Sequence, residues 1–240
     1  MSALWGTIVN ALAVVLGSLA GLVLPRMPDR MREAVMQGLG LAILFLGVSM
    51  GLKTQNFILV IMSLALGGVL GSLLRLDEFL DWAGRRLEAA VKKGGGGGGA
   101  VAEGFVSATL LFCVGAMAVI GAIEGALRGD HTILYTKSLL DGISAMLLTA
   151  ALGIGVIFSA AALLLYQGAI ALSAKYITSF LSAVELDLVV TEVSAVGGIL
   201  VAAIGLGVLN VKKINVVNLL PSIVVMAGLV LVNNRWGFLG

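Results

Sequence analysis

Long apolar runs, each close to 20 residues and separated by short polar connections, fill almost the whole of this 240-residue chain. An α-helix needs about 20 consecutive apolar residues to cross the hydrocarbon core of a bilayer. A soluble surface would need more charge than this chain carries, since 12% of its residues are charged against about 25% in soluble domains. The pattern therefore predicts an all-α, polytopic transmembrane helix bundle whose outer surface is mostly covered by lipid.

We expect seven or eight spans. The number depends on residues 138–174, which are too long for one crossing at normal tilt and which we divide into two helices. One long, broken helix is the alternative. The expected spans cover about residues 5–24, 34–52, 57–74, 104–123, 139–157, 159–173, 189–209 and 214–232.

A run of six glycines at residues 94–99 divides the chain into two hydrophobic halves. The first half, residues 1–93, holds three spans and ends in an amphipathic pattern at residues 75–93 that predicts a surface helix. Residues 94–102 form the expected flexible linker, and residues 103–240 form a second half of four or five spans. Residues 42–47 weakly resemble residues 109–115, which fits either two related halves, as in repeat-built transporters, or chance similarity between apolar segments.

Basic residues indicate the orientation of the bundle. With eight spans, one set of alternate loops holds ten Lys and Arg residues and the other set holds five, out of 15 in the chain. Because cytoplasmic loops are enriched in Lys and Arg, the first set is expected in the cytoplasm and both termini outside. A seven-span arrangement would put the C-terminus inside.

Two carboxylates within the apolar segments, Asp141 and Glu192, are the leading candidates for binding an ion or a solute. An ionised side chain near mid-membrane costs about 2.5–3.5 kcal/mol on insertion scales, so its presence needs a partner or a use. Carboxylate and hydroxyl oxygens suit Na⁺ or H⁺ better than a transition metal. Alternatively, each carboxylate lies at the membrane interface. Asp141 can also form an ion pair with Lys137, which is four residues earlier in the sequence.

Uncharged polar residues within or beside the spans complete the set of candidates. Amides there either bridge two helices or contact a solute. Pro221 lies inside the last expected span, where it predicts a kink or a break that frees a backbone carbonyl. The candidates added to the two carboxylates are Asn10, Ser138, Gln167 and Asn218.

Several function classes are disfavoured by the sequence. Catalytic motifs such as His-Glu-x-x-His or a nucleophile elbow are missing, so we expect no enzyme, no catalytic residues and no cofactor. The single cysteine, Cys113, lies in an apolar run and predicts neither a disulfide nor a metal site. A formal net charge of +2 with no basic tract gives no reason to expect a nucleic-acid partner.

Four segments resemble the bacterial YqgA/YdfK-type multi-pass inner-membrane proteins, a family of unknown function. They are G-T-I-V-N at 6–10, E-G-F-V-x-A-x-L-L-F-x-V-G-A-M at 103–117, K-S-x-L-D-G at 137–142 and Y-Q-G at 166–168. The resemblance extends over essentially the whole chain, although the six-glycine run replaces the charged linker usual in that family. It implies a location in the bacterial inner membrane and a compact bundle, and it supplies no substrate. It also draws attention to Asn10, Glu103, Lys137, Ser138, Asp141 and Gln167.

Together these features lead to two hypotheses. The first is a secondary transporter of a small solute or ion, with H⁺ or Na⁺ coupling through the intramembrane carboxylates. The second is a non-transporting membrane scaffold or regulatory subunit that binds another protein through its glycine-lined helices. A cavity reaching Asp141 or Glu192 favours the transporter, and a dry, fully packed centre favours the scaffold. Under either hypothesis we expect the lipid bilayer as surroundings and a homo-oligomer as the assembly.

Overall fold

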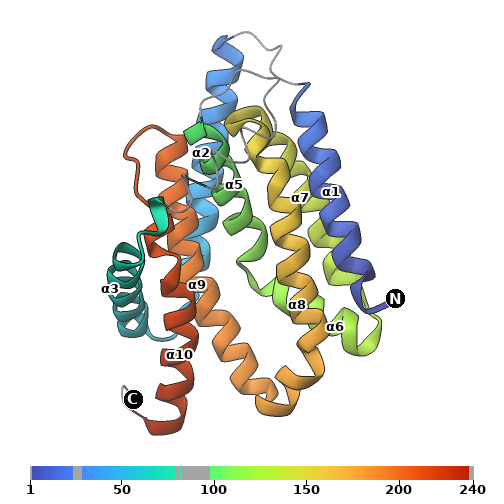
Figure 1. Cartoon of the computed structure of the whole chain (residues 1–240), viewed down its shortest axis with the longest axis vertical. Helices are drawn as coiled ribbons and strands as arrows, with labels where there is room; N and C mark the ends of the chain where they lie inside the picture. The colour runs from blue at the N-terminus through green and yellow to red at the C-terminus, as the bar shows by residue number, and fades with distance from the viewer. Residues whose placement is uncertain (1, 24–28, 79–81, 83–97, 238–240) are drawn as a thin grey trace. The chain divides into compact units, whose positions relative to one another are not determined.

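A computed structural model describes residues 2–23, 29–78, 82 and 98–237, and the regular secondary structure in these residues is entirely helical (Figure 1). The α-helices are α1 (Trp5–Gly21), α2 (Asp29–Gly51), α3 (Phe57–Leu73), α5 (Gly98–Cys113), α6 (Ala116–Arg128), α7 (Thr132–Leu152), α8 (Ser159–Phe180), α9 (Ala183–Val208) and α10 (Pro221–Trp236). Short 3₁₀ helices precede α1, α8 and α10, namely η1 (Ser2–Leu4), η3 (Ile154–Phe158) and η4 (Val217–Leu219). The all-α fold class predicted from the sequence is confirmed.

Among the described residues, three helical segments are long and apolar enough to cross a membrane, or four if the bent pair α5–α6 is one span. The three are Ile154–Phe180, Ala183–Val208 and Val217–Trp236. This is fewer than the seven or eight spans expected. The shorter apolar helices Trp5–Gly21 and Phe57–Leu73 have 17 residues each. At 1.5 Å per residue they extend about 25 Å, slightly less than a typical hydrocarbon core of about 30 Å.

Several expected spans differ in detail from the helices observed. The span at 104–123 is two helices, because the chain bends by 58° between α5 and α6, where Gly115 has a φ of +147°. Residues 138–174 do form two helices, as expected, but α7 starts earlier than predicted and α8 continues beyond Lys175 to Phe180. Pro221 is the first residue of α10 and does not kink it, since a proline at this position lacks only an N–H that would have no partner within the helix.

Side-chain caps explain where two of the helices begin. The side chain of Asn56 accepts hydrogen bonds from the backbone N–H groups of Ile58 and Leu59 and so starts α3. Ser182 and Glu185 form a capping box that starts α9. Residues 183–188, which lie between two of the expected spans, are therefore the first turns of a helix, because the capping box satisfies the backbone N–H groups there.

The described residues fall into two compact units, and each includes residues from both sides of the glycine run. Unit 1 comprises Met1–Gln37, Phe79–Cys113 and Met117–Lys175, and unit 2 comprises Gly38–Glu78, Val114–Ala116 and Tyr176–Gly240. The expected surface helix at 75–93 and the first part of the expected linker lie almost wholly outside the described residues, which resume at Gly98 in α5. The division into residues 1–93, 94–102 and 103–240 stays a prediction from the sequence.

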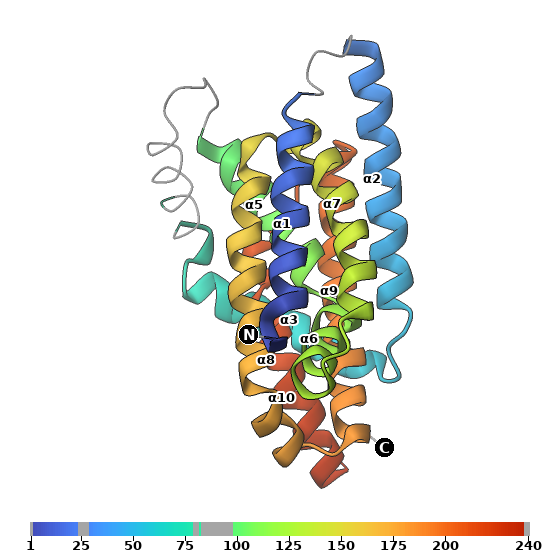
Figure 2. The ribbon, with the colours of Figure 1, turned by 90° about the vertical axis from the view of Figure 1, so that its right-hand side faces the viewer.

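In unit 1, α1 and α7 run parallel and side by side (Figures 1 and 2). Gly17 of α1 faces the backbone of Gly142, and Gly21 faces that of Met146. A Cβ atom added at either glycine would overlap a carbonyl oxygen of α7. This close approach brings polar side chains of α1 within hydrogen-bonding distance of α7.

In unit 2, α9 packs antiparallel to the second part of α2, with Gly47 against Gly198 and Ala202. Helix α10 packs against both α3 and α9 (Figure 1). The apolar core of this unit is formed by buried residues of these helices, namely Leu59, Val60, Val196, Met226 and Val230. Glu192 of α9 lies one turn before Val196, at the edge of this core.

Candidate functional site

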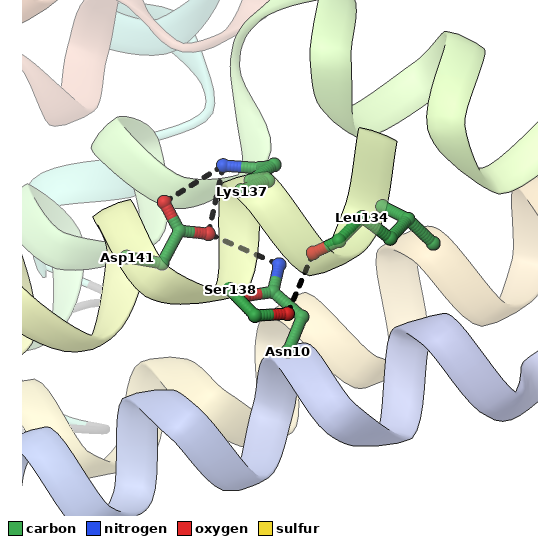
Figure 3. Close-up of polar contacts among 5 residues, drawn as sticks. All are labelled: Asn10, Leu134, Lys137, Ser138 and Asp141. Carbon is green, nitrogen blue, oxygen red and sulfur yellow. Dashed lines mark hydrogen bonds and ion pairs between the residues drawn. The ribbon is translucent and has the colours of Figure 1, made fainter. Parts of the chain in front are cut away.

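Asp141 is part of a buried polar network between α7 and α1 (Figure 3). The Lys137 ammonium donates a hydrogen bond to Asp141 Oδ1 at 2.8 Å and lies 2.7 Å from Oδ2. The Asn10 amide of α1 donates to Asp141 Oδ2 at 3.0 Å. Lys137 and Asp141 share one face of α7 because they are four residues apart, and the glycine contacts between the helices bring Asn10 within reach.

The network lies deep within its helix and its unit. Asp141 is 5% exposed, Lys137 is 7% exposed and Asn10 is fully buried. Asp141 is also nine residues after the first residue of α7, about 14 Å along the helix axis. It is therefore a buried, paired carboxylate, as in the ion-pair alternative weighed from the sequence, and it does not lie at a helix end. Removing one partner of such a pair leaves an uncompensated buried charge and costs about 3–5 kcal/mol.

Other buried polar atoms of unit 1 have no hydrogen-bond partner among the described residues. They include Asn10 Oδ1, the hydroxyl of Thr7 one turn earlier on α1, and both amide atoms of Gln167 on α8. Buried polar groups without partners are uncommon in folded proteins, and each needs an explanation. Gln167 is fully buried, as expected for a residue within a bundle, and the structure gives it no hydrogen bond to Asp141.

Ser138 lies next to Lys137 but does not contact the carboxylate. Its hydroxyl donates to the backbone carbonyl of Leu134 at 2.6 Å, one turn back in α7 (Figure 3). This bond within the helix satisfies the hydroxyl locally. Ser138 also borders an open groove of about 340 Å³ between α1 and α7 that is lined mainly by apolar residues. The structure therefore gives its side chain no bond within the network.

The second carboxylate, Glu192, belongs to unit 2 and has different partners. It is 1% exposed and lies nine residues into α9, about 14 Å along the helix axis. The hydroxyl of Thr54 donates to Glu192 Oε2 at 2.5 Å, and the backbone N–H of Gln55 donates to Oε1 at 2.6 Å. Across the described residues, Glu192 forms no ion pair with a lysine or arginine. It is held by neutral donors alone.

The turn between α2 and α3 positions those donors. Thr54 Oγ1 accepts a hydrogen bond from the backbone N–H of Asn56 while its own hydrogen points to Glu192. Asn56 is the N-cap of α3. The polar turn at residues 53–56 is therefore held at one end by a helix cap and in the middle by the carboxylate.

Glu192 also lines a hollow of about 320 Å³ within unit 2. Its polar walls come from the turn before α3 and from the last turn of α10, and its apolar walls come from the core. The lining residues are Gln55, Asn56, Leu59, Leu188, Glu192, Val230, Asn233, Asn234 and Gly237. At the far wall, Asn234 Nδ2 donates to Glu185 at 3.2 Å, and Gly237 adopts the left-handed conformation that ends α10. A buried carboxylate among four amide side chains suits a small ligand that is cationic or rich in hydrogen-bond donors.

Asn218 lies elsewhere in unit 2. Its side-chain oxygen accepts from the backbone N–H of Asp77 at 3.2 Å, and its own backbone packs against Gly71 of α3. It does not line the hollow. Asn218 therefore connects η4 to the segment after α3, the helix-bridging role that is the common use of an amide.

Comparison with known proteins decides the family. A family described as "Protein of unknown function (DUF554)" matches residues 5–231. The chain belongs to this family. It is 35% identical over 241 residues to the "Uncharacterized membrane protein YdfK" of Bacillus subtilis (strain 168), covering 98% of this chain and 99% of that protein. It is 30% identical over 221 residues to the "Uncharacterized protein YqgA" of Escherichia coli (strain K12), covering 91% and 92%. No solved structure gives a significant match.

The family resemblance inferred from the sequence is thus confirmed. The structure brings Asn10 and Asp141 of this family member together with Lys137, and it places Glu192 and Asn218 in the other unit, each with separate partners. Sequence reasoning missed the four amide residues that line the hollow with Glu192, namely Gln55, Asn56, Asn233 and Asn234. Their signal was the presence of two amide pairs, one just before a span and one near the end of another. The described residues hold no group of three or more His, Cys, Asp and Glu side chains suited to a metal ion.

Proposed function

We propose that this chain is a multi-pass protein of the bacterial inner membrane that transports a small solute, with H⁺ or Na⁺ coupling through Asp141 and Glu192. The relative from Bacillus subtilis carries the words membrane protein in its name. A catalytic role is not part of the proposal. A small cationic solute, or Na⁺ itself, is the ligand class that the chemistry of the hollow favours.

The hollow at Glu192 is the observation that carries the proposal. Burying an ionised carboxylate in an apolar helix is costly unless its charge is balanced. The partners of Glu192 are a hydroxyl and a backbone N–H, both neutral, so its negative charge is available to a cation in the hollow. A volume of about 320 Å³ is at the lower end of the range of about 300–1,000 Å³ for ligand pockets, which suits a small solute.

The helices support a multi-pass arrangement. Of the helices that the structure describes, three are long and apolar enough to span, and α5–α6 is a fourth if the bent pair crosses as one. If α7 and the shorter apolar helices α1, α2 and α3 also cross, the number of spans is eight. Local thinning of the bilayer accommodates short spans at modest cost.

A scaffold or regulatory subunit is the competing function. It has no need of a buried, unpaired carboxylate beside a cavity, and a well-packed apolar residue at position 192 would stabilise it more. The amides that converge on the hollow therefore favour the transporter.

A thermal-shift screen of detergent-purified protein tests the proposal. A ligand that binds only the folded state raises the apparent Tm. The screen should include alkali cations, ammonium, primary and quaternary amines and amino acids, with organic anions as a negative set. We expect one or more cations or amines to raise the Tm of the wild type, and the shift to disappear in Glu192→Gln.

The matched control is Asp187→Asn, which removes an exposed carboxylate from the same helix. It should retain the full shift. Stabilisation by the same ligand in Glu192→Gln, or by organic anions as strongly as by cations, would contradict a cation-selective site at Glu192.

A further inference from the structure

Asp141 is paired with a cation that belongs to its own helix. The Lys137 ammonium contacts both carboxylate oxygens, at 2.8 and 2.7 Å, and almost no solvent reaches either side chain. The four-carbon chain of lysine allows its ammonium to withdraw without any movement of the backbone. Lys137 therefore fills a buried, negatively charged position as a tethered occupant.

Further buried oxygen atoms lie on the face of α1 that carries Asn10. Asn10 Oδ1 is fully buried and has no hydrogen-bond partner among the described residues, while the other end of the same amide contacts Asp141. A half-turn of this amide about χ2 would present its carbonyl oxygen to the site in place of its N–H group. The Thr7 hydroxyl, one turn away on the same face of α1, is likewise buried and without a partner. Carboxylate, amide and hydroxyl oxygens are the ligands that hard cations prefer.

We propose that Asp141 and Asn10 form a binding site for a small monovalent cation, and that Lys137 is the competing cation that occupies this site when it is otherwise empty. The purpose of this site, which is to couple cation binding to solute movement, rests on the proposed transport function. Exchange between Lys137 and a cation from solution would keep the carboxylate neutralised at both stages, which avoids a bare charge in the membrane. The binding itself can be tested without any transport assay.

The experiment removes the competitor. Lys137→Met should bind Na⁺ or Li⁺ more tightly than the wild type. In the wild type, only those molecules whose site is free of the Lys137 ammonium can bind the added cation, which lowers its apparent affinity. If Lys137 fills the site in about nine molecules of ten or more, the apparent Kd should fall at least about tenfold. It can be measured by titrating NaCl or LiCl against choline chloride at constant ionic strength, with the apparent Tm of the full-length protein as the readout.

Two controls make the result specific. The series is measured in a Glu192→Gln background, which removes the other proposed cation site. There, Lys137→Met/Asp141→Asn lacks both charges and should show no difference between Na⁺ and choline. Arg128→Gln opens the exposed pair between Glu124 and Arg128, whose side chains are 28% and 75% exposed, and it should leave the wild-type cation response unchanged. Lys137→Gln serves as a second variant if Lys137→Met is not recovered in folded form, and radioactive Na⁺ retained by either single variant should be lost in the double variant.

Three results would overturn the cation site: no Na⁺ or Li⁺ effect in either single variant, an equal effect in the double variant, or stabilisation of the single variants by protons with no effect of the metal cations. None of these results changes the outcome expected from the ligand screen at Glu192. Conversely, loss of the Glu192 site would leave cation binding at Asp141 in place without a transported solute.

Discussion

Asp141 and Glu192 lie at equal depths in their helices, but their charges are balanced in different ways. Asp141 has a lysine on its own helix and an amide from α1. Glu192 has a hydroxyl and a backbone N–H from a turn, together with an adjoining hollow. The charge of Asp141 is thus balanced by a lysine of the protein. Among the described residues, Glu192 has no such counter-ion. At the scale of single residues, this difference is the basis for proposing a ligand site at Glu192 and a cation site at Asp141.

Changing Asp141 alone should be strongly destabilising. Asp141→Asn leaves the Lys137 ammonium buried without a counter-ion, which costs about 3–5 kcal/mol of unfolding free energy. Lys137→Met/Asp141→Asn should recover most of the loss, since a neutral pair of similar volume can replace a buried ion pair at little cost. Unfolding in mixed detergent–SDS micelles measures both.

The exposed pair between Glu124 and Arg128 supplies the comparison for this measurement. Glu124→Gln should change stability by only about 0–1 kcal/mol, because solvent screens the pair. If Asp141→Asn is no more destabilising than Glu124→Gln, the ion pair at Asp141 is not buried as described.

At the scale of the helices, close approach through glycine decides which polar groups meet. Gly17 and Gly21, like Gly67 and Gly71, are four residues apart in the sequence, and each of the four packs against the backbone of a neighbouring helix. The small-residue pattern can be recognised from the sequence because it is local. Which helix each glycine faces could not be predicted, since that depends on contacts between residues far apart in the chain.

Enlarging Gly17 should separate α1 from α7. A methyl group there would overlap the Gly142 carbonyl, so Gly17→Ala should cost about 1–3 kcal/mol through overpacking. It should also weaken the bond from Asn10 to Asp141. Gly228→Ala on α10 is the matched control, because an added Cβ there meets no atom within 4 Å. Equal stability of the two variants, measured by thermal unfolding, would show that α1 and α7 do not approach closely at Gly17.

Helix boundaries were the least predictable feature of the elements. The break between α5 and α6 falls within a run that is apolar on both sides, so hydropathy carries no sign of it. The expected span at 189–209 starts too late, because α9 begins at Ala183, after the capping box of Ser182 and Glu185. The late start put Glu192 three residues into its expected span, whereas it lies about 14 Å into α9. Caps therefore deserve more weight than charge in locating the ends of spans.

For the whole molecule, composition was sufficient to predict an all-helical membrane protein, and four segments were sufficient to predict its family. The compact units were not predictable, because each combines segments from both sides of the glycine run. For the same reason the sequence did not show that Asp141 and Glu192 have separate partners in separate units. A homo-oligomer and the cytoplasmic side of the loops stay predictions.

Transport itself is the central claim, and charge movement tests it most directly. Proteoliposomes adsorbed on a solid-supported membrane report the transient current that follows a jump in solute concentration. With a cation or amine that raises the Tm of the wild type, we predict a current that is abolished in Glu192→Gln and retained in Asp187→Asn. Identical currents from the wild type, Glu192→Gln and protein-free liposomes across the same solutes would contradict the transporter and favour a scaffold.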